Sequence, residues 1–232
     1  MRYLSDWYLC LFYFMKYLVL ITFIILASCS GTRQVIPLKK GENTVSADLG
    51  GPLFKFSGIV IPMPLTSLAY SRGISDKITV TGAVHTTSLL FGVYHLEGSG
   101  LMKVHEWNKG RSGFSFSPGF HTMVDKWESR FSFYPYGDFY YYRYTGEKNN
   151  HFFAGMSLFF DVRSKKAFDV ENSHRVIHNL SAGYKWVRPK FTWSAEMKYL
   201  NFTRDNRNIV VEYIAPGKYG ALGIYFGVTK TF

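Results

Sequence analysis

The chain has 232 residues, enough for one domain of barrel or sandwich size, and 19% of them are aromatic, with 21 Phe and 17 Tyr. Mean hydropathy is -0.04, which argues against a helical membrane protein with several apolar runs of about 20 residues and suits strands that alternate apolar and polar side chains. The formal net charge of +11 favours contact with anionic surfaces such as lipid phosphates.

The long apolar run at the N-terminus indicates a targeting segment. A short positive region, Met15-Lys16, precedes the apolar stretch 17–25, and Leu26-Ala-Ser-Cys29 follows. This order resembles the bacterial lipobox, in which the cysteine is acylated and becomes the first residue of the mature protein. The resemblance implies a signal peptide over residues 1–28, with translation starting at Met15, and lipidation of Cys29. A transmembrane anchor over Leu9–Leu26 is the alternative, and Lys16 interrupts it.

Cysteine usage agrees with this interpretation. Only Cys10 and Cys29 are present, so the mature chain would have no disulfide and no cysteine metal site. We expect residues 29–43 to form a lipidated tether and residues 44–232 a β-barrel. Removal of residues 1–28 leaves a charge of +10, and behind an export signal we expect outer-membrane lipids and lipopolysaccharide as partners rather than nucleic acid.

From Glu42 onward the sequence shows strand-length runs separated by turn residues, and we predict no helix there. Residues 57–64 are expected to form a loop. The stretch Tyr70–Val80 resembles a hairpin common in outer-membrane barrels, with Gly73 and Asp76 in a tight periplasmic turn. The ten predicted strands are Thr44–Phe56, Leu65–Arg72, Lys77–His85, Leu89–Leu101, Gly113–Met123, Glu128–Tyr144, His151–Val162, Val176–Val187, Lys190–Phe202 and Tyr219–Phe232.

The last predicted strand has the clearest alternation. One face carries bulky apolar side chains and the other carries glycine, alanine, threonine and tyrosine, as expected for lipid outside and a narrow or wet lumen inside. A terminal phenylalanine with apolar residues at alternating upstream positions resembles the signal read by the barrel-assembly machinery, which implies that machinery as a partner. The residues that would carry this signal are Phe232, Val228, Phe226 and Ile224. Because an open sheet edge in lipid leaves backbone groups unpaired, we expect the last strand to pair with the first.

These patterns predict an all-β fold: an antiparallel up-and-down transmembrane β-barrel of about ten strands, with eight or twelve as alternatives. If Cys29 is lipidated on the periplasmic side of the outer membrane and the chain ends there too, the strand number must be even, which places the long loops 163–175 and 203–218 outside the cell. Two stretches fit poorly, because 103–111 would be a long inner turn and 135–138 could be a turn within a strand. A soluble, lipocalin-like periplasmic barrel with its apolar faces inward is the structural alternative.

We predict no cofactor and no enzymatic activity. Some barrels of this kind modify lipids, which requires a histidine that activates a nucleophile or water. His85 near Ser88, His121 with Thr122, and His174 are the candidates, but no G-x-S-x-G motif is present and we expect rim or loop histidines. The expected function is structural, ligand-binding or porin-like passage of a narrow substrate, because side chains largely fill a barrel of this size.

Three further groups have a functional and an ordinary interpretation. Five acidic and histidine residues around one outer loop could hold a metal, but a solvated loop is preferred. These are Asp161, Asp169, Glu171, His174 and His178. The tyrosine run 139–144 could stack a ligand, but an interfacial aromatic girdle is preferred. Basic loop residues that could contact lipopolysaccharide phosphates, or simply be solvated, are Lys165, Lys166, Arg175, Arg204 and Arg207.

Overall fold

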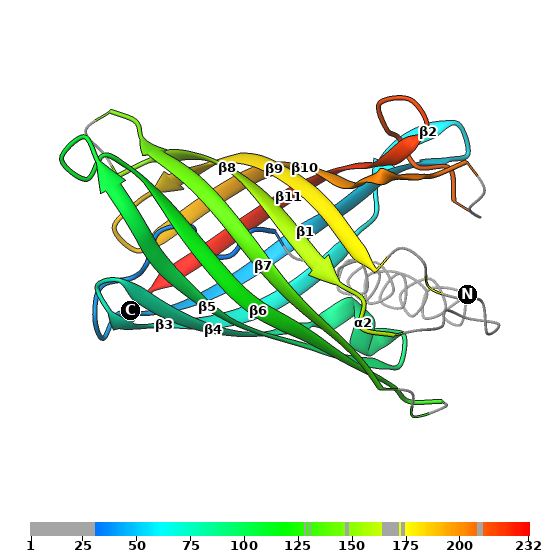
Figure 1. The fold of residues 1–232 in the computed structure, drawn as a ribbon, viewed down its shortest axis with the longest axis horizontal. Helices are drawn as coiled ribbons and strands as arrows, with labels where there is room; N and C mark the ends of the chain where they lie inside the picture. The colour runs from blue at the N-terminus through cyan, green and yellow to red at the C-terminus, as the bar shows by residue number, and fades with distance from the viewer. Residues whose placement is uncertain are drawn as a thin grey trace, which may run out of the picture.

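The computed structural model describes residues 31–127, 129, 131–146, 149–163, 172, 175–207 and 211–232. Within these residues one antiparallel sheet closes on itself to form a barrel (Figure 1). Its elements are β1 (Asn43–Phe56), β2 (Ile59–Pro62), β3 (Leu65–Ser75), β4 (Ile78–His85), α2 (Thr86–Leu90), β5 (Val93–Trp107), β6 (Ser112–Asp125), β7 (Phe131–Tyr144), β8 (His151–Phe160), β9 (Val176–Val187), β10 (Phe191–Asp205) and β11 (Tyr219–Thr231).

Ten of the strands form the barrel wall, and β2 pairs only with the end of β1, from Leu53↔Pro62 to Phe56↔Ile59. The wall closes where β1 pairs with β11, from Thr44↔Thr231 to Pro52↔Gly223. The ten-strand antiparallel barrel and the pairing of first and last strands are therefore confirmed. Closure satisfies the backbone groups that an open edge would leave without partners in lipid.

The two faces of the wall differ in chemistry. On β11, for example, Tyr225 is 3% exposed and its neighbour Phe226 is 54% exposed. Outward-facing apolar side chains on the wall include Val45, Leu49, Leu68, Val80, Leu96, Phe114, Phe120, Phe139, Phe152, Met156, Leu180, Trp193, Met197 and Phe226. Most buried polar side chains face the interior, so the alternative of a soluble barrel with apolar faces inward is wrong.

Four details differ from the sequence prediction. Residues 59–62 are a strand rather than loop, and residues 86–90 form the short helix α2, so β5 begins at Val93. The expected long turn 103–111 shortens to 108–111, because β5 continues to Trp107 and three consecutive residues with positive φ reverse the chain. Pro135 lies within β7 rather than in a turn. The pairing of β7 with β8 covers only Tyr136–Tyr144, so β8 does not need the N–H that proline lacks.

The two ends of the barrel differ in their connections. One end, here the turn end, holds the C-terminus, the start of β1 and the short connections β3–β4, β5–β6, β7–β8 and β9–β10 (Figure 1). The other, the loop end, holds β2, α2 and the described residues that follow β6, β8 and β10. No helix within the described ranges is long and apolar enough to span a membrane.

Candidate functional site in the barrel lumen

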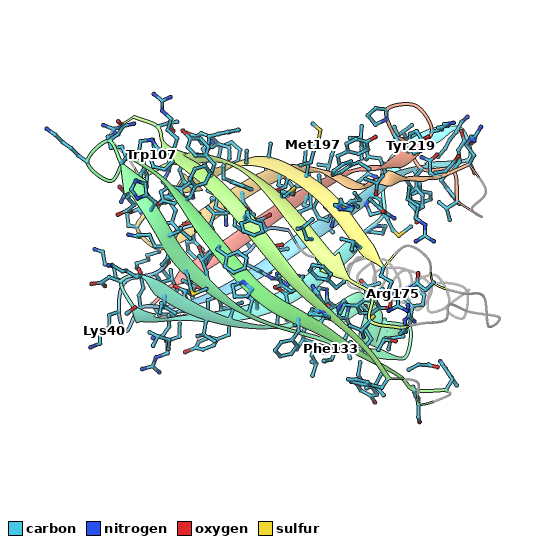
Figure 2. All side chains as sticks on the ribbon, viewed as in Figure 1. Lys40, Trp107, Phe133, Arg175, Met197 and Tyr219 are labelled. Atoms are coloured by element: carbon cyan, nitrogen blue, oxygen red, sulfur yellow. The ribbon has the colours of Figure 1, made fainter. Side chains whose placement is uncertain are left out.

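Residues 31–39, called here the N-terminal segment, run through the barrel lumen to its turn end, where Lys39 is exposed. Ser115 Oγ of β6 donates a hydrogen bond to the Val35 carbonyl at 2.6 Å, and the Leu38 N–H donates to Thr79 Oγ1 of β4 at 2.8 Å. Val35 has no exposed surface. The chain leaves the lumen at the turn end, where Lys40 lies (Figure 2). Residues 31–38 of the predicted tether therefore occupy the lumen, and its last residue, Asn43, begins β1.

Arg33 joins two acidic side chains of the wall. Its Nη1 forms an ion pair with Asp48 of β1 and donates to Ser67 Oγ at 2.9 Å, while its Nη2 lies 2.9 Å from Glu97 Oε2 of β5. The three charged side chains are 9%, 5% and 4% exposed. Charges so far from solvent require partners, so Arg33 compensates carboxylates that the wall strands alone would leave less well paired.

Backbone groups of the segment bind a second set of charges. The Thr32 N–H donates to Glu196 Oε2 at 2.6 Å, and Thr32 Oγ1 donates to Glu196 Oε1. The Lys185 ammonium of β9 donates to the Thr32 carbonyl at 3.3 Å and to the Arg33 carbonyl. Lys198 Nζ also lies 3.6 Å from Glu196 Oε1. The segment is thus held by specific polar contacts to β1, β5, β9 and β10.

An apolar cluster supports the segment closer to the turn end. Val35 packs with Leu101, Tyr140, Tyr142 and Phe153, all of which are buried. The tyrosine run predicted as an interfacial girdle therefore has two roles. Tyr140 and Tyr142 fill the lumen, whereas the side chain of Phe139 points to the outer face of the wall and is 47% exposed.

Three histidines meet inside the lumen towards the loop end. His85 ends β4, His95 lies near the start of β5, and His121 lies near the end of β6. They are 2%, 7% and 8% exposed. The rings of His85 and His95 stack with centroids 3.7 Å apart, and His95 Nε2 lies 2.9 Å from His121 Nδ1. The expectation that His85 and His121 are rim or loop histidines is therefore wrong.

Glu97 connects the histidines to Arg33. Its Oε2 lies 3.1 Å from His85 Nε2, and Tyr136 OH donates to its Oε1 at 3.3 Å. Sequence reasoning missed His95 and Glu97, although both fall on the inward face of one strand at a spacing of two residues. The pair of Arg33 with Asp48 of β1 was also missed, because a short polar segment before the first strand gives no sign that Arg33 enters the lumen.

The residues considered for lipid hydrolysis do not assemble as that chemistry requires. Ser88 Oγ lies 3.3 Å from His95 Nδ1, not beside His85, and the other nitrogen of His95 faces His121 rather than a carboxylate. The candidate His174 lies outside the described residues. A nucleophile and base are close, but the carboxylate that would orient the base is replaced by a histidine.

The acidic and histidine group considered around the outer loop is only partly described. Arg163 Nε donates to Asp161 Oδ1 at 3.0 Å, and this hydrogen bond holds the pKa of the Asp161 carboxyl below its usual value. His178 Nδ1 lies 3.4 Å from Thr203 Oγ1. Asp169 and Glu171 lie outside the described residues, as do the loop lysines Lys165 and Lys166. Within the described ranges, the group of three histidine or acidic ligands that a metal could join is His85, His95 and His121.

The closed wall, its apolar outer face and its polar lumen are the features of a barrel that spans a lipid bilayer. The molecule is an outer-membrane type β-barrel. No protein-family model matches the sequence, and no curated protein matches it. Whether Phe232 and its upstream partners on β11 are read during assembly, and whether Cys29 carries lipid, stay predictions, and Cys29 lies outside the described residues.

Solved structures with a similar fold include three outer-membrane proteins. An outer membrane channel from Pseudomonas putida F1 has 9% identity and a TM-score of 0.44 over 88% of this chain and 100% of that one. Outer membrane protein OprG from Pseudomonas aeruginosa has 9% identity and a TM-score of 0.33 over 86% and 99%. The attachment invasion locus protein Ail of Yersinia pestis has 11% identity and a TM-score of 0.29 over 83% and 99%. At these values the likeness extends no further than the fold.

Proposed function

We propose that this protein is an outer-membrane barrel whose N-terminal segment closes the lumen, and that displacement of the segment opens a narrow passage for small polar solutes. The observation that carries the proposal is the pairing of wall charges with the segment. Asp48 and Glu97 bind Arg33, Glu196 binds Thr32, and Lys185 binds segment carbonyls. Buried charges need either these partners or water. The lining is therefore compatible with a closed state, in which the segment pairs with it, and with an open state, in which water does.

The charged lining favours passage over a purely structural role. Buried ion pairs contribute little net stability compared with well-packed apolar side chains, so a barrel built only for stability has no need of them. The passage would be narrow, because a wall of ten strands leaves little room and the bulky side chains of Tyr140, Tyr142 and Phe153 fill part of it. We therefore propose small polar solutes rather than folded proteins or long polymers.

We further propose that the turn end faces the periplasm, with both termini of the barrel on that side. Short connections on the periplasmic side and longer ones outside are the usual asymmetry of such barrels. The segment would then enter from the periplasm, and the three histidines would lie in the outer half of the lumen. We propose that outer-membrane lipids contact the outward-facing apolar side chains of the wall. Lipopolysaccharide phosphates would contact the exposed Arg175, and the barrel-assembly machinery would bind β11.

A non-enzymatic role is part of the proposal. Ser88 of α2 and His95 of β5 are the closest approach to a nucleophile and base, but His95 is buried in the lumen, away from the lipid-facing surface. A lipid hydrolase of this architecture would lose activity towards phospholipid vesicles on His95→Ala substitution. We expect no such activity in the unmodified chain.

Single-channel recording in planar lipid bilayers tests the proposed passage. The full chain is compared with a variant in which residues 31–39 are replaced by a glycine-serine sequence of equal length. We expect the full chain to be mostly closed and the variant to conduct steadily. The control is Asp205→Ala, which breaks an exposed ion pair with Arg207 at the loop end and should behave as the full chain does. Equal conductance of the full chain and the glycine-serine variant would show that the segment does not gate the lumen.

A further inference from the structure

We propose that His85, His95 and His121 form a binding site for a divalent transition-metal ion, of the class of Zn²⁺, Cu²⁺ or Ni²⁺. This proposal stands on the geometry of the three side chains and does not depend on whether the barrel conducts. One ring nitrogen from each histidine lies within 4.8 Å of the others. A tetrahedral zinc ion with Zn–N bonds of about 2.0–2.1 Å holds its nitrogens about 3.3–3.4 Å apart, so small side-chain adjustments complete the site.

The surroundings of His85 orient it as a ligand. Glu97 Oε2 lies 3.1 Å from His85 Nε2, where the carboxylate accepts a hydrogen bond from the ring N–H. That bond fixes the tautomer and leaves Nδ1 with its lone pair. His85 Nδ1 is buried and has no hydrogen-bond partner among the described residues. A carboxylate behind a histidine with a free second nitrogen is the usual arrangement at protein metal centres.

The other two rings present nitrogens to each other. Ser88 Oγ lies beside His95 Nδ1 at 3.3 Å, so Nε2 of that ring is the nitrogen that faces His121, at 2.9 Å from its Nδ1. The stacked rings of His85 and His95 keep the first two ligands on the same side of the lumen. The three rings come from three adjacent strands and are therefore held by the wall rather than by loops.

The type of ligand decides the ion. Neutral imidazole nitrogens suit zinc, copper, nickel and iron, whereas calcium and magnesium require oxygen ligands. Glu97 places one carboxylate directly beside the histidines, while Arg33, Lys185 and Lys198 balance the charges of Glu97, Asp48 and Glu196 along the lumen, so the nitrogen ligands rather than an excess of negative charge select the ion. Three protein ligands also leave a fourth position for water or an anion.

Metal binding is tested on the tag-free full chain, refolded in detergent and freed of metal by chelation. Heat-modifiability on gels confirms that each variant is folded. We expect isothermal titration with Zn²⁺ to give one equivalent and Co²⁺ to give the visible absorption bands of a tetrahedral nitrogen site. His95→Ala should abolish both signals, and Glu97→Gln should weaken zinc binding by about 10–100-fold, the usual cost of losing an outer-shell partner.

His151→Ala is the matched control, since His151 is a lumen histidine that is 6% exposed and lies at the turn end of β8. It should bind zinc as the unmodified chain does. Absence of binding by the folded full chain, unchanged binding by His95→Ala, or equal loss in His151→Ala would each overturn the site. If His95→Ala does not fold, the zinc X-ray absorption spectrum of the unmodified chain decides, because the site requires three nitrogen neighbours at about 2.0–2.1 Å.

Discussion

Replacement of Arg33 by alanine removes the single guanidinium that bridges Asp48 and Glu97. The two carboxylates are 5% and 4% exposed, so neither is well solvated once its partner is gone. Removing one member of a buried ion pair typically costs about 3–5 kcal/mol, because the other member stays charged and unpaired. Since Glu97 retains His85 and Tyr136 as neighbours and water can enter the lumen, we expect the lower end, about 3 kcal/mol of the free energy of unfolding.

Urea unfolding in lipid vesicles measures this loss through the fluorescence of the five tryptophans. Arg207→Ala is the matched control, because Arg207 also forms an ion pair, with Asp205 at 2.7 Å, but the two side chains are 61% and 40% exposed. Water and salt screen such a surface pair, so its unfolding midpoint should not change. The double variant Arg33→Ala/Glu97→Gln should recover part of the stability, because one unpaired charge is removed with its partner.

Two results would refute this reasoning. If Arg33→Ala unfolds at the same urea concentration as Arg207→Ala, the lumen carboxylates are solvated and do not depend on the segment. If Arg33→Ala is destabilised but Glu97→Gln restores nothing, the loss comes from packing of the segment rather than from an unpaired charge.

Two further predictions concern the segment and the outer face. Gly73→Val places a side chain against the Lys39 carbonyl, so the segment should lose its contact with β3 at the turn end and trypsin should cleave after Lys39 faster. The control is Gly82→Val, which adds its side chain in open space and should be cleaved at the rate of the unmodified chain. Unchanged cleavage in Gly73→Val would contradict this contact. Phe226→Arg, midway along the lipid face of β11, should destabilise the barrel by about 2–4 kcal/mol, whereas Tyr219→Arg at the loop end should cost about 0–1 kcal/mol in the same urea assay. Equal losses would mean that Phe226 does not face the membrane interior.

The sequence predicts the wall because alternation is a local property. On β11 the alternation of bulky apolar residues with small or polar ones shows which side chains face lipid and which face the lumen. Pairing of β11 with β1 then follows, because lipid offers no hydrogen-bond partners to an open sheet edge. The same holds for the hairpin joining β9 and β10, where Pro189 lies in a turn that needs no ladder donor. Turn and loop lengths were less accurate, since both ends of β5 were misplaced.

The histidine cluster depends on register, which local alternation does not give. His121 lies opposite Glu97, and His95 lies two pairs further along the same ladder, opposite Met123. On the next ladder Val84 lies opposite Leu96, which brings His85 beside His95. These pairings depend on where α2 ends and on the short turn 108–111, the two features of β5 that the sequence prediction missed. Without them, sequence spacing alone does not bring the three histidines together.

The position of Gly31 bears directly on the predicted lipidation of Cys29. A Cβ at Gly31 would lie 3.0 Å from Asp48 Oδ1 and 3.6 Å from Glu196 Oε2, so Gly31 is enclosed by the wall. Asp48 is five residues into β1 from the turn end, about 17 Å along the strand and, with the usual tilt, about 13 Å in depth. Two residues reach at most about 7 Å, which is less than the distance to that end. An acyl chain on Cys29 that inserts into the periplasmic leaflet therefore requires the segment to leave the lumen.

Mass spectrometry of the mature protein and of its Cys29→Ala variant detects acyl groups, and bilayer conductance shows whether the lumen is open. If the mature protein carries acyl groups, we expect its lumen to be open and to close again in the Cys29→Ala variant, as seen by bilayer conductance. If the mature protein carries none, the closed state is its resting state and the lipobox resemblance is coincidental. An acylated protein that stays closed, with Arg33 still paired to Asp48, would contradict the reach argument, because the chain is too short to satisfy both sites at once.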